Sequence, residues 1–242
     1  MTGGLLISLS AIDEERWGVR TARASGVTAE RLPDVLAFCR QEKVMFLVAR
    51  CAVSELRAAQ MMEAQGFRLM DTLLYYSRDL TQPLPPVSNG VRPADAGEAE
   101  AIRVLAGRAF RAYNGHYHAD ERLDRAACDA VYESWAYRSC LSRQVADEVL
   151  VAAPNGQIAG FITLRLNGAQ GEGPLYAVDP EAQGQGIGRA LMAGALHWLQ
   201  ERGVHHMLMS TQVTNVPSQK VWTRLGFEPS HAEYTFHRWF DE

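Results

Sequence analysis

One stretch, residues 175–192, predicts a strand, a glycine-rich turn and the start of a helix, and it constrains the fold more than any other part of the chain. Its first four residues form an apolar run that Asp179-Pro180 ends. The glycines that follow permit positive φ angles and let a ligand approach the backbone closely. Because the first N–H groups of a helix have no partner within the helix, such a junction favours a bound anion. The stretch therefore predicts a phosphate site.

The order of residues in this turn narrows the kind of site. The sequence Gln183-Gly184-Gln185-Gly186-Ile187-Gly188 fits neither the dinucleotide motif G-x-G-x-x-G nor the nucleotide triphosphate motif G-x-x-x-x-G-K-S/T. A plain tight connection between a strand and a helix is an alternative interpretation of three glycines. Directly after a strand that ends Val-Asp-Pro, the pattern Gln-x-x-Gly-x-Gly resembles the acyl-CoA pyrophosphate loop of the GNAT acetyltransferase superfamily.

The composition is that of a globular protein and bounds its partners. With 242 residues, the chain is long enough for one or two domains at roughly 150 residues each. Hydrophobic residues make up 47% of it, and the formal net charge of -4 argues against a polyanion such as nucleic acid as the main partner. Nucleic acid is therefore not an expected partner.

Cysteine spacing and hydropathy indicate the compartment. The four cysteines lack C-x-x-C spacing, so free thiols in a reducing compartment are expected rather than zinc or disulfide bonds. No apolar run approaches the roughly 18 residues of a membrane-spanning helix, and no signal-peptide pattern opens the chain. A cytoplasmic protein without membrane association is expected.

A proline-rich segment divides the chain. Residues 18–80 alternate between strand and helix patterns, as in an α/β half-domain. Residues 81–90 contain three prolines and can continue neither element, so they are the predicted linker. Beyond them, Asn155-Gly156 between two apolar runs predicts a β-hairpin, and Asn215 predicts the N-cap of a helix that Gly226 ends.

The two parts of the chain share a corner pattern. Residues 61–67, followed by Tyr76, parallel residues 221–227, followed by Phe236, because each has a helix end, a Gly-Phe turn and an aromatic strand. Chance similarity between two helix–strand corners is the alternative. As a second copy of the fold, the first part would lack a glycine-rich turn and so have a structural or acceptor-shaping role.

As a whole, residues 91–242 resemble a complete GNAT domain and residues 1–80 a truncated GNAT-like half. The resemblance implies an α/β fold with a central mixed β-sheet flanked by helices. A degenerate half before a complete one, with the loop of residues 116–120 preceding residues 129–135, is similar to the dTDP-fucosamine acetyltransferases. Those enzymes acetylate the amine of a nucleotide-linked amino sugar.

The resemblance also implies roles for individual residues. The backbone of the turn would hold the pyrophosphate of acetyl-CoA, and Ala177 and Val178 would face the pantetheine arm and the acetyl carbonyl. Asn215 matches a position that contacts CoA, although it is equally interpreted as a plain N-cap, and one residue can do both. The residues implied for the turn are Gln183, Gly184, Gln185, Gly186, Ile187, Gly188 and Arg189.

Trp222 departs from the family pattern. The family usually has a tyrosine at this position, and that tyrosine protonates the departing CoA sulfur. An indole N–H cannot act as such an acid, but it can hydrogen-bond the sulfur. Because a thiol with a pKa near ~8.5 is a tolerable leaving group, either another residue supplies the proton or none does.

The loop residues His116, Tyr117 and His118 are candidates for this proton transfer, since their loop borders the acceptor side in the family. Tyr117 and His118 are the predicted catalytic pair, and all three are predicted to bind the acceptor. A surface loop without a catalytic role is the alternative. No metal is expected at this loop.

The resulting hypothesis is acetyl transfer from acetyl-CoA to the amine of a small molecule, with a nucleotide-linked amino sugar as the finer suggestion. Two alternatives stay open. One is acetylation of a protein or peptide amine, and the other is a non-catalytic CoA-binding sensor, which Trp222 makes conceivable. The sequence names neither the acceptor nor the oligomeric state, so a homodimer is left open.

Overall fold

The computed structural model describes residues 4–87 and 90–240, which fall into two compact units. Unit 1 contains the chain up to Leu74, the segment Asn114–Asp124 and the chain from His231 onward. Unit 2 contains the segments Tyr75–Tyr113 and Arg125–Ser230. Each unit combines helices with strands, and the sheet is mixed, which confirms the predicted α/β class.

Unit 1 is built around strand β3, which is buried along most of its length. Its elements are β1 (Leu6–Leu9), α1 (Ala11–Trp17), β2 (Thr21–Ser25), α2 (Leu32–Gln41), β3 (Phe46–Ala52) and α3 (Leu56–Ala64). Strand β2 runs antiparallel to β1 and parallel to β3, and β3 pairs on its other edge with residues 233–239 of β11 (Glu228–Trp239). A strand that is paired on both edges and covered by helices explains the continuous apolar sequence here.

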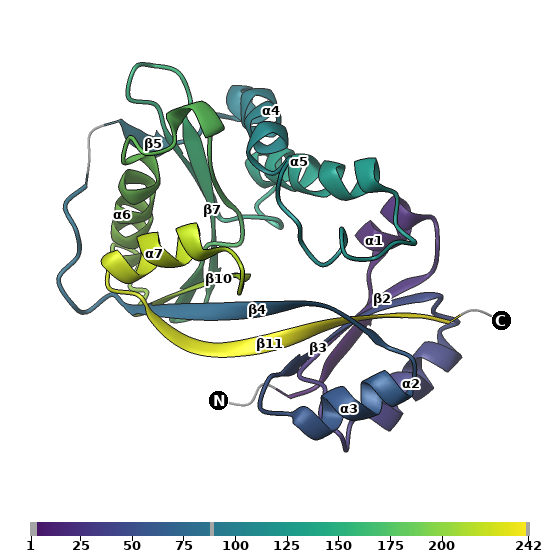
Figure 1. The fold of residues 1–242 in the computed structure, drawn as a ribbon. Coiled ribbons are helices and arrows are strands. Elements are labelled where there is room, and N and C mark those ends of the chain that lie inside the picture. Colours follow the sequence, from purple (N-terminus) through teal and green to yellow (C-terminus); the bar gives the residue numbers. More distant parts are fainter. Residues whose placement is uncertain (1–3, 88–89, 241–242) are drawn as a thin grey trace. The chain divides into compact units, whose positions relative to one another are not determined.

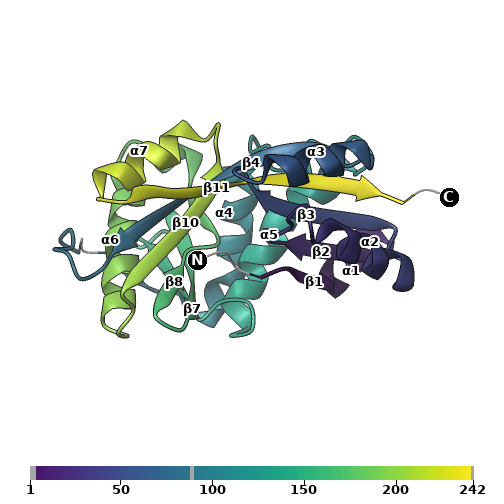
Figure 2. The same ribbon diagram turned by 90° about the horizontal axis from the view of Figure 1, so that it is seen from below.

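Unit 2 holds the glycine-rich turn. Its elements are β5 (Val91–Pro93), η1 (Ala96–Glu98), α4 (Ala99–Ala109), α5 (Arg125–Leu141), β6 (Glu148–Ala152), β7 (Gly160–Asn167), β8 (Gln170–Glu172), β9 (Tyr176–Val178), η2 (Pro180–Ala182), α6 (Ile187–Gln200), β10 (His206–Gln212) and α7 (Val216–Arg224). The strand order is β10-β8-β7-β6-β5, with β9 paired to β7, and Figure 2 shows β10, β8 and β7 side by side. Helix α6 covers one face of this sheet, and α4 and α5 lie on the other (Figure 1).

Strand β4 (Arg68–Asp79) contributes residues to both units. Its last five residues belong to unit 2, where β4 is the neighbour of β10. Just beyond the strand, Leu80 N donates a hydrogen bond to His205 O at 2.8 Å, and Leu80 is buried. The first part of the chain thus supplies a strand to the unit that carries the glycine-rich turn.

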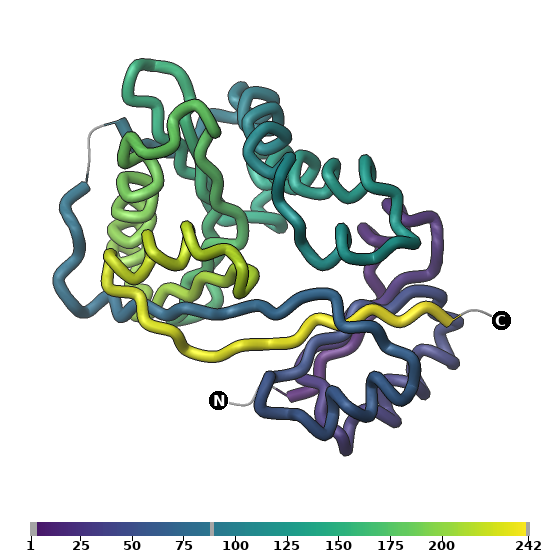
Figure 3. The backbone as a smooth tube through the Cα atoms, viewed as in Figure 1, coloured from purple at the N-terminus to yellow at the C-terminus, as the bar shows by residue number. Residues whose placement is uncertain are grey.

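The predicted linker and domain boundaries differ in part from the boundaries of the two compact units. Residues 81–87 form no helix or strand and lead from β4 toward β5 (Figure 3), whereas Ser88 and Asn89 lie outside the described residues. The predicted domains 1–80 and 91–242 are each continuous in sequence, but both compact units are discontinuous. Whether residues 91–242 behave as a domain stays a prediction.

The two corners that the sequence relates have the same local geometry. Phe67 N donates to Met62 O and Phe227 N donates to Trp222 O, each at 3.0 Å. The glycine before each phenylalanine has a φ near +80°, at 79° and 80°. The predicted hairpin between β6 and β7 and the N-cap at Asn215 are confirmed as well.

Sequence reasoning missed β1, α1 and β8, which have four, seven and three residues and are too short to show a clear period. Over residues 4–87 and 90–240, no helix has the length and apolar character needed to cross a membrane.

Candidate functional site

One edge of β9 is open. Among the described strands, β9 pairs only with β7. Asp179 N, directly after the strand, donates to Ala159 O at 2.9 Å, so the backbone of Asp179 faces β7. Because backbone groups alternate along a strand, Ala177 also faces β7, whereas the N–H and C=O groups of Tyr176 and Val178 face the open edge. Of the two predicted strand residues, Val178 is therefore the one whose backbone can meet a ligand.

The turn that follows is exposed and leads into α6. Gly184 and Gly186 have φ angles of 79° and 81°, which strain any residue with a side chain. Gly186 is the N-cap of α6, and the hydrogen bond from Ala190 N to Gly186 O, at 3.0 Å, is the first one of the helix. The N–H groups of residues 187–189 precede that bond, so they have no partner within the helix and can bind an anion.

Arg108 fixes the point where β9 enters the turn. Its Nε, at the end of α4, donates to Asp179 Oδ2 at 3.1 Å, and Glu181 N donates to Asp179 Oδ1 at 3.1 Å. Burial raises the pKa of Asp179, but the hydrogen bonds from Arg108 and Glu181 outweigh it and leave that pKa below its usual value. The carboxylate therefore stays ionised at neutral pH. Sequence reasoning missed Arg108, because no local pattern links it to residue 179.

Tyr176 explains the third glycine of the motif. A Cβ atom added at Gly188 would lie 2.2 Å from the Tyr176 hydroxyl oxygen and 3.3 Å from its Cζ. The Tyr176 ring thus occupies the space that a side chain on the first turn of α6 would need. Because side chains alternate between the two faces of a strand, Tyr176 and Val178 point to the same face. This alternation was the sequence signal that could have placed Tyr176 beside the helix.

Gly188→Ala is expected to destabilise the protein by about 1–3 kcal/mol, the usual cost of overpacking, although alanine favours a helix. Tyr176→Phe removes the clashing oxygen, so the double variant Gly188→Ala, Tyr176→Phe should recover most of that loss. Urea unfolding of the four proteins measures the coupling. Strictly additive effects of the two substitutions would contradict this explanation.

Trp222 is 2% exposed and packs against Tyr76, with ring centroids 5.6 Å apart. No described residue accepts a hydrogen bond from its Nε1. A buried donor left without a partner costs about 1–3 kcal/mol. An unpaired donor of this kind is expected where a ligand supplies the acceptor.

Asn215 acts as the N-cap of α7, with Oδ1 accepting from Ser218 N at 3.4 Å, and its Nδ2 donates to Thr211 Oγ1 at 2.8 Å. Its contact with CoA stays a prediction.

Tyr117 lies in unit 1 and is 3% exposed. Its hydroxyl donates to Oδ1 of the fully buried Asp13 at 3.1 Å and accepts a hydrogen bond from Arg23. Burial raises the pKa of Tyr117 to about 12, with Arg23 opposing the shift and Asp13 adding to it. These contacts hold the loop to α1 and β2.

His116 and Asp120 continue this anchoring toward β11. Asp120 Oδ2 accepts from His237 Nδ1 at 2.7 Å and from Trp239 Nε1 at 2.9 Å. The remaining nitrogen of His237, Nε2, lies 2.8 Å from His116 Nδ1, so a neutral His237 accepts a hydrogen bond there from the Nδ1–H of His116. Burial lowers the pKa of both histidines.

His118 is the half-buried member of the loop, and its Nδ1 accepts from Gly115 N at 3.2 Å. Within the described part of the chain, no three or more His, Cys, Asp or Glu side chains gather as metal ligands. The acid–base roles predicted for Tyr117 and His118 stay predictions.

Tyr117→Phe is expected to change how stability depends on alkaline pH. The folded-state pKa of about 12 exceeds the ~10 of an unfolded tyrosine, so the folded state binds this proton more tightly. The contribution to stability is full below pH ~10 and is lost as pH rises toward 12, up to roughly 3 kcal/mol. Urea unfolding at pH 8 to 11 should show a shallower alkaline decline for Tyr117→Phe than for wild type. Parallel alkaline declines in Tyr117→Phe and wild type would refute this prediction. The control is Tyr137→Phe, which removes a hydroxyl at an exposed position.

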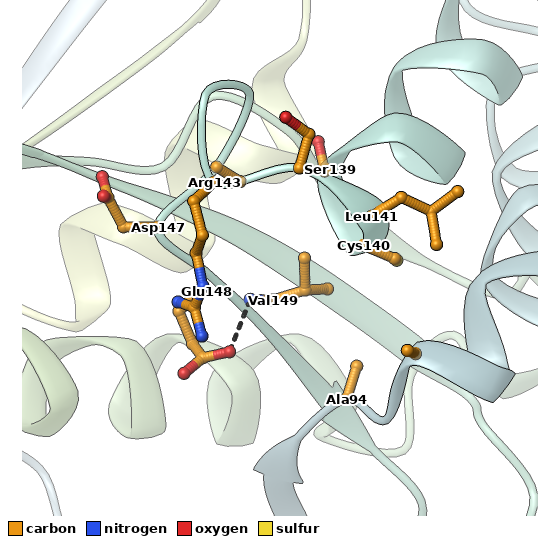
Figure 4. A pocket seen from close by; sticks show the side chains of 11 residues that line it. Ala94, Ser139, Cys140, Leu141, Arg143, Asp147, Glu148 and Val149 are labelled. Atoms are coloured by element: carbon orange, nitrogen blue, oxygen red, sulfur yellow. Dashed lines mark hydrogen bonds between the residues drawn. The ribbon is translucent and has the colours of Figure 1, made fainter.

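A cavity of about 240 Å³ lies elsewhere in unit 2, between the end of α5 and the start of β6 (Figure 4). Its lining includes Arg143 and Glu148. Glu148 begins β6, whereas Ala152 at the other end of that strand is paired through Gly160 with Val178. The cavity is therefore separate from the open edge of β9.

Comparison with known proteins identifies the family. Residues 108–227 match the model of the acetyltransferase (GNAT) family, and the chain therefore contains an acetyltransferase domain of that family. The matched segment includes the turn, Trp222 and the loop of residues 116–118. The loop belongs by its contacts to unit 1.

Two curated relatives and one solved structure extend this result. The chain is 30% identical over 213 residues to the mycothiol acetyltransferase of Acidothermus cellulolyticus, covering 77% of this chain and 61% of that protein. It is 26% identical over 147 residues to the spore coat polysaccharide biosynthesis protein SpsD of Bacillus subtilis, covering 61% and 50%. The chain thus spans between half and two thirds of the length of these relatives. A GCN5-related N-acetyltransferase from Sphaerobacter thermophilus matches 97% of this chain and 76% of its own, with 16% identity and a TM-score of 0.67, which shows the GNAT fold.

Proposed function

We propose that this chain transfers the acetyl group of acetyl-CoA to the amine of a small molecule. The observation that carries the proposal is the exposed turn at the start of α6, adjoining the open edge of β9. Unpaired N–H groups suit a pyrophosphate, and an open strand edge suits the amide groups of a pantetheine arm. The orphaned Nε1 of Trp222 supports the same ligand, because a thioester sulfur or its thiolate can accept that hydrogen bond.

In this proposal the backbone does most of the chemical work. The N–H of Val178 at the open edge stabilises the negative charge that develops on the acetyl oxygen. Arg108 and Asp179 hold the turn in place, and His118 accepts the proton of the acceptor ammonium so that a neutral amine attacks. Tyr117 positions the loop through Asp13, because its hydroxyl donates to that carboxylate and its raised pKa of about 12 makes it a weaker acid than an ordinary tyrosine.

The names of the relatives support a small-molecule acceptor. One is named for acetylation connected with mycothiol and the other for the biosynthesis of a polysaccharide. Both favour an amine carried by a small molecule or a carbohydrate over a peptide amine. We therefore propose that the acceptor is an amino sugar, and more specifically a nucleotide-linked amino sugar.

Release of CoA thiol tests the proposal. Acetyl-CoA is supplied with free amino sugars, nucleotide-linked amino sugars and a lysine peptide, and thiol release is followed for wild type and His118→Gln. Release that depends on a sugar amine supports the proposal, and His118→Gln should lower it. Trp222, which lacks an acidic hydroxyl, favours a second candidate, a CoA-binding sensor. Tight CoA binding with no release in any arm would select the sensor.

A further inference from the structure

A buried phenol lies beside Trp222 within unit 2. Tyr76, near the end of β4, is 5% exposed, and its ring meets the Trp222 ring edge-on at 67° with centroids 5.6 Å apart. Strand β4 comes from the first part of the chain, whereas Trp222 lies on α7, in the last part of the chain. The fold thus brings a tyrosine hydroxyl next to the position where the family usually has its tyrosine.

The hydroxyl of Tyr76 donates its proton toward the side chain of Gln219. The hydroxyl lies 3.3 Å from Gln219 Oε1, three residues before Trp222 on α7. The Nε2 of Gln219 donates to the backbone oxygens of Gln212 and Val213, at 3.3 and 2.8 Å, which fixes Oε1 as the atom that faces Tyr76. An amide oxygen only accepts, so Tyr76 is the donor in this contact.

The contact with Gln219 is weak. A hydroxyl donor usually lies about 2.7–2.8 Å from its acceptor, and here the separation is 3.3 Å. Tyr76 therefore loses little when it turns its proton from the amide to a stronger acceptor near Trp222. A charged sulfur is such an acceptor, because hydrogen bonds to charged groups are roughly twice as strong as neutral ones.

We propose that Tyr76 is the general acid that Trp222 cannot be, donating its phenolic proton to the departing CoA sulfur. This inference rests on the proposed acetyl transfer. The amine nitrogen forms a bond to the acetyl carbon, the carbon–sulfur bond breaks with its electron pair on sulfur, and Tyr76 gives its proton to that sulfur. The proton that the nitrogen loses passes to solvent, from which the phenolate of Tyr76 is reprotonated. Trp222 hydrogen-bonds the same sulfur through Nε1.

The test compares Tyr76→Phe with Tyr75→Phe, which removes a phenol from the neighbouring position on the opposite face of β4. Tyr76→Phe should lower kcat by about 10²-fold or more, as removal of a general acid commonly does, whereas Tyr75→Phe should stay near wild type. Adding Trp222→Tyr to Tyr76→Phe should restore much of the rate, because it installs a phenol at the usual position. Thermal melts of each variant show that it is folded.

A binding measurement separates this inference from the proposed function. At pH 9, where a thiol of pKa ~8.5 is mostly thiolate, wild type should bind CoA more tightly than desulfo-CoA, and Tyr76→Phe should lose about tenfold of that preference. An unchanged preference in Tyr76→Phe would overturn the inference, even if kcat falls. If wild type transfers no acetyl group at all, the proposed function fails, while the CoA and desulfo-CoA affinities still decide whether Tyr76 reaches the sulfur.

Discussion

Replacing Gly186 by aspartate is expected to abolish the thermal stabilisation that acetyl-CoA gives the wild-type protein. A ligand bound only to the folded state stabilises it by about 2.7 kcal/mol at a hundred times its Kd. Gly186 is the N-cap of α6, so an aspartate there places a carboxylate against the N–H groups of residues 187–189 and repels a pyrophosphate. Thermal shift with acetyl-CoA measures the loss.

The control for this variant is Gly168→Asp, in the turn between β7 and β8. Gly168 has a φ of 62°, close to the 81° of Gly186, and an added Cβ would meet nothing within 4 Å at either glycine. The control therefore introduces the same charge and a similar backbone strain away from the turn. It should lower the melting temperature but keep the full shift with acetyl-CoA. Equal shifts in Gly186→Asp and wild type would remove the turn from the binding site.

Residues 91–242 expressed alone are expected to be insoluble. This fragment lacks residues 75–79 of β4, which belong to unit 2 and neighbour β10. It also lacks the buried side chains of Tyr76 and Leu80. Without β4, one edge of β10 is an unpaired strand edge next to exposed apolar surface, which promotes aggregation. Soluble yield and acetyl-CoA thermal shift are the measurements.

A longer fragment, residues 75–242, separates loss of this strand from loss of unit 1 as a whole. It restores Tyr75 to Asp79 without the rest of the first part of the chain. It should be more soluble than residues 91–242 and regain a shift with acetyl-CoA. Residues 91–242 that are soluble and bind acetyl-CoA as well as the full chain would show that β4 is dispensable for unit 2.

Local patterns predicted the parts of this fold that depend on neighbouring residues. The turn around Gly186, the Gly-Phe corners before Phe67 and Phe227 and the N-cap at Asn215 each need a particular residue at one backbone position. Such requirements can be recognised in a few consecutive residues of the sequence. They also carried the family resemblance, because the CoA loop is a local motif.

Contacts between distant residues were beyond sequence reasoning. No period or motif shows that β4 completes unit 2, that Arg108 reaches Asp179 or that Tyr176 fills the space above Gly188. Asp13 lies in a short, highly charged helix whose sequence suggests a solvent-facing segment, yet it is fully buried and binds Tyr117. These pairings arise from topology, which places segments side by side irrespective of their separation in the chain.

Mass spectrometry of the acceptor tests acetyl transfer most directly. The wild-type protein is incubated with acetyl-CoA that carries a heavy-isotope acetyl group, together with the amine that gives the fastest thiol release. The product should carry one heavy acetyl group on its amine nitrogen, and Gly186→Asp should form far less of it. Thiol release without a labelled amine, or equal labelling by wild type and Gly186→Asp, would contradict an acetyltransferase whose donor site is the turn at the start of α6.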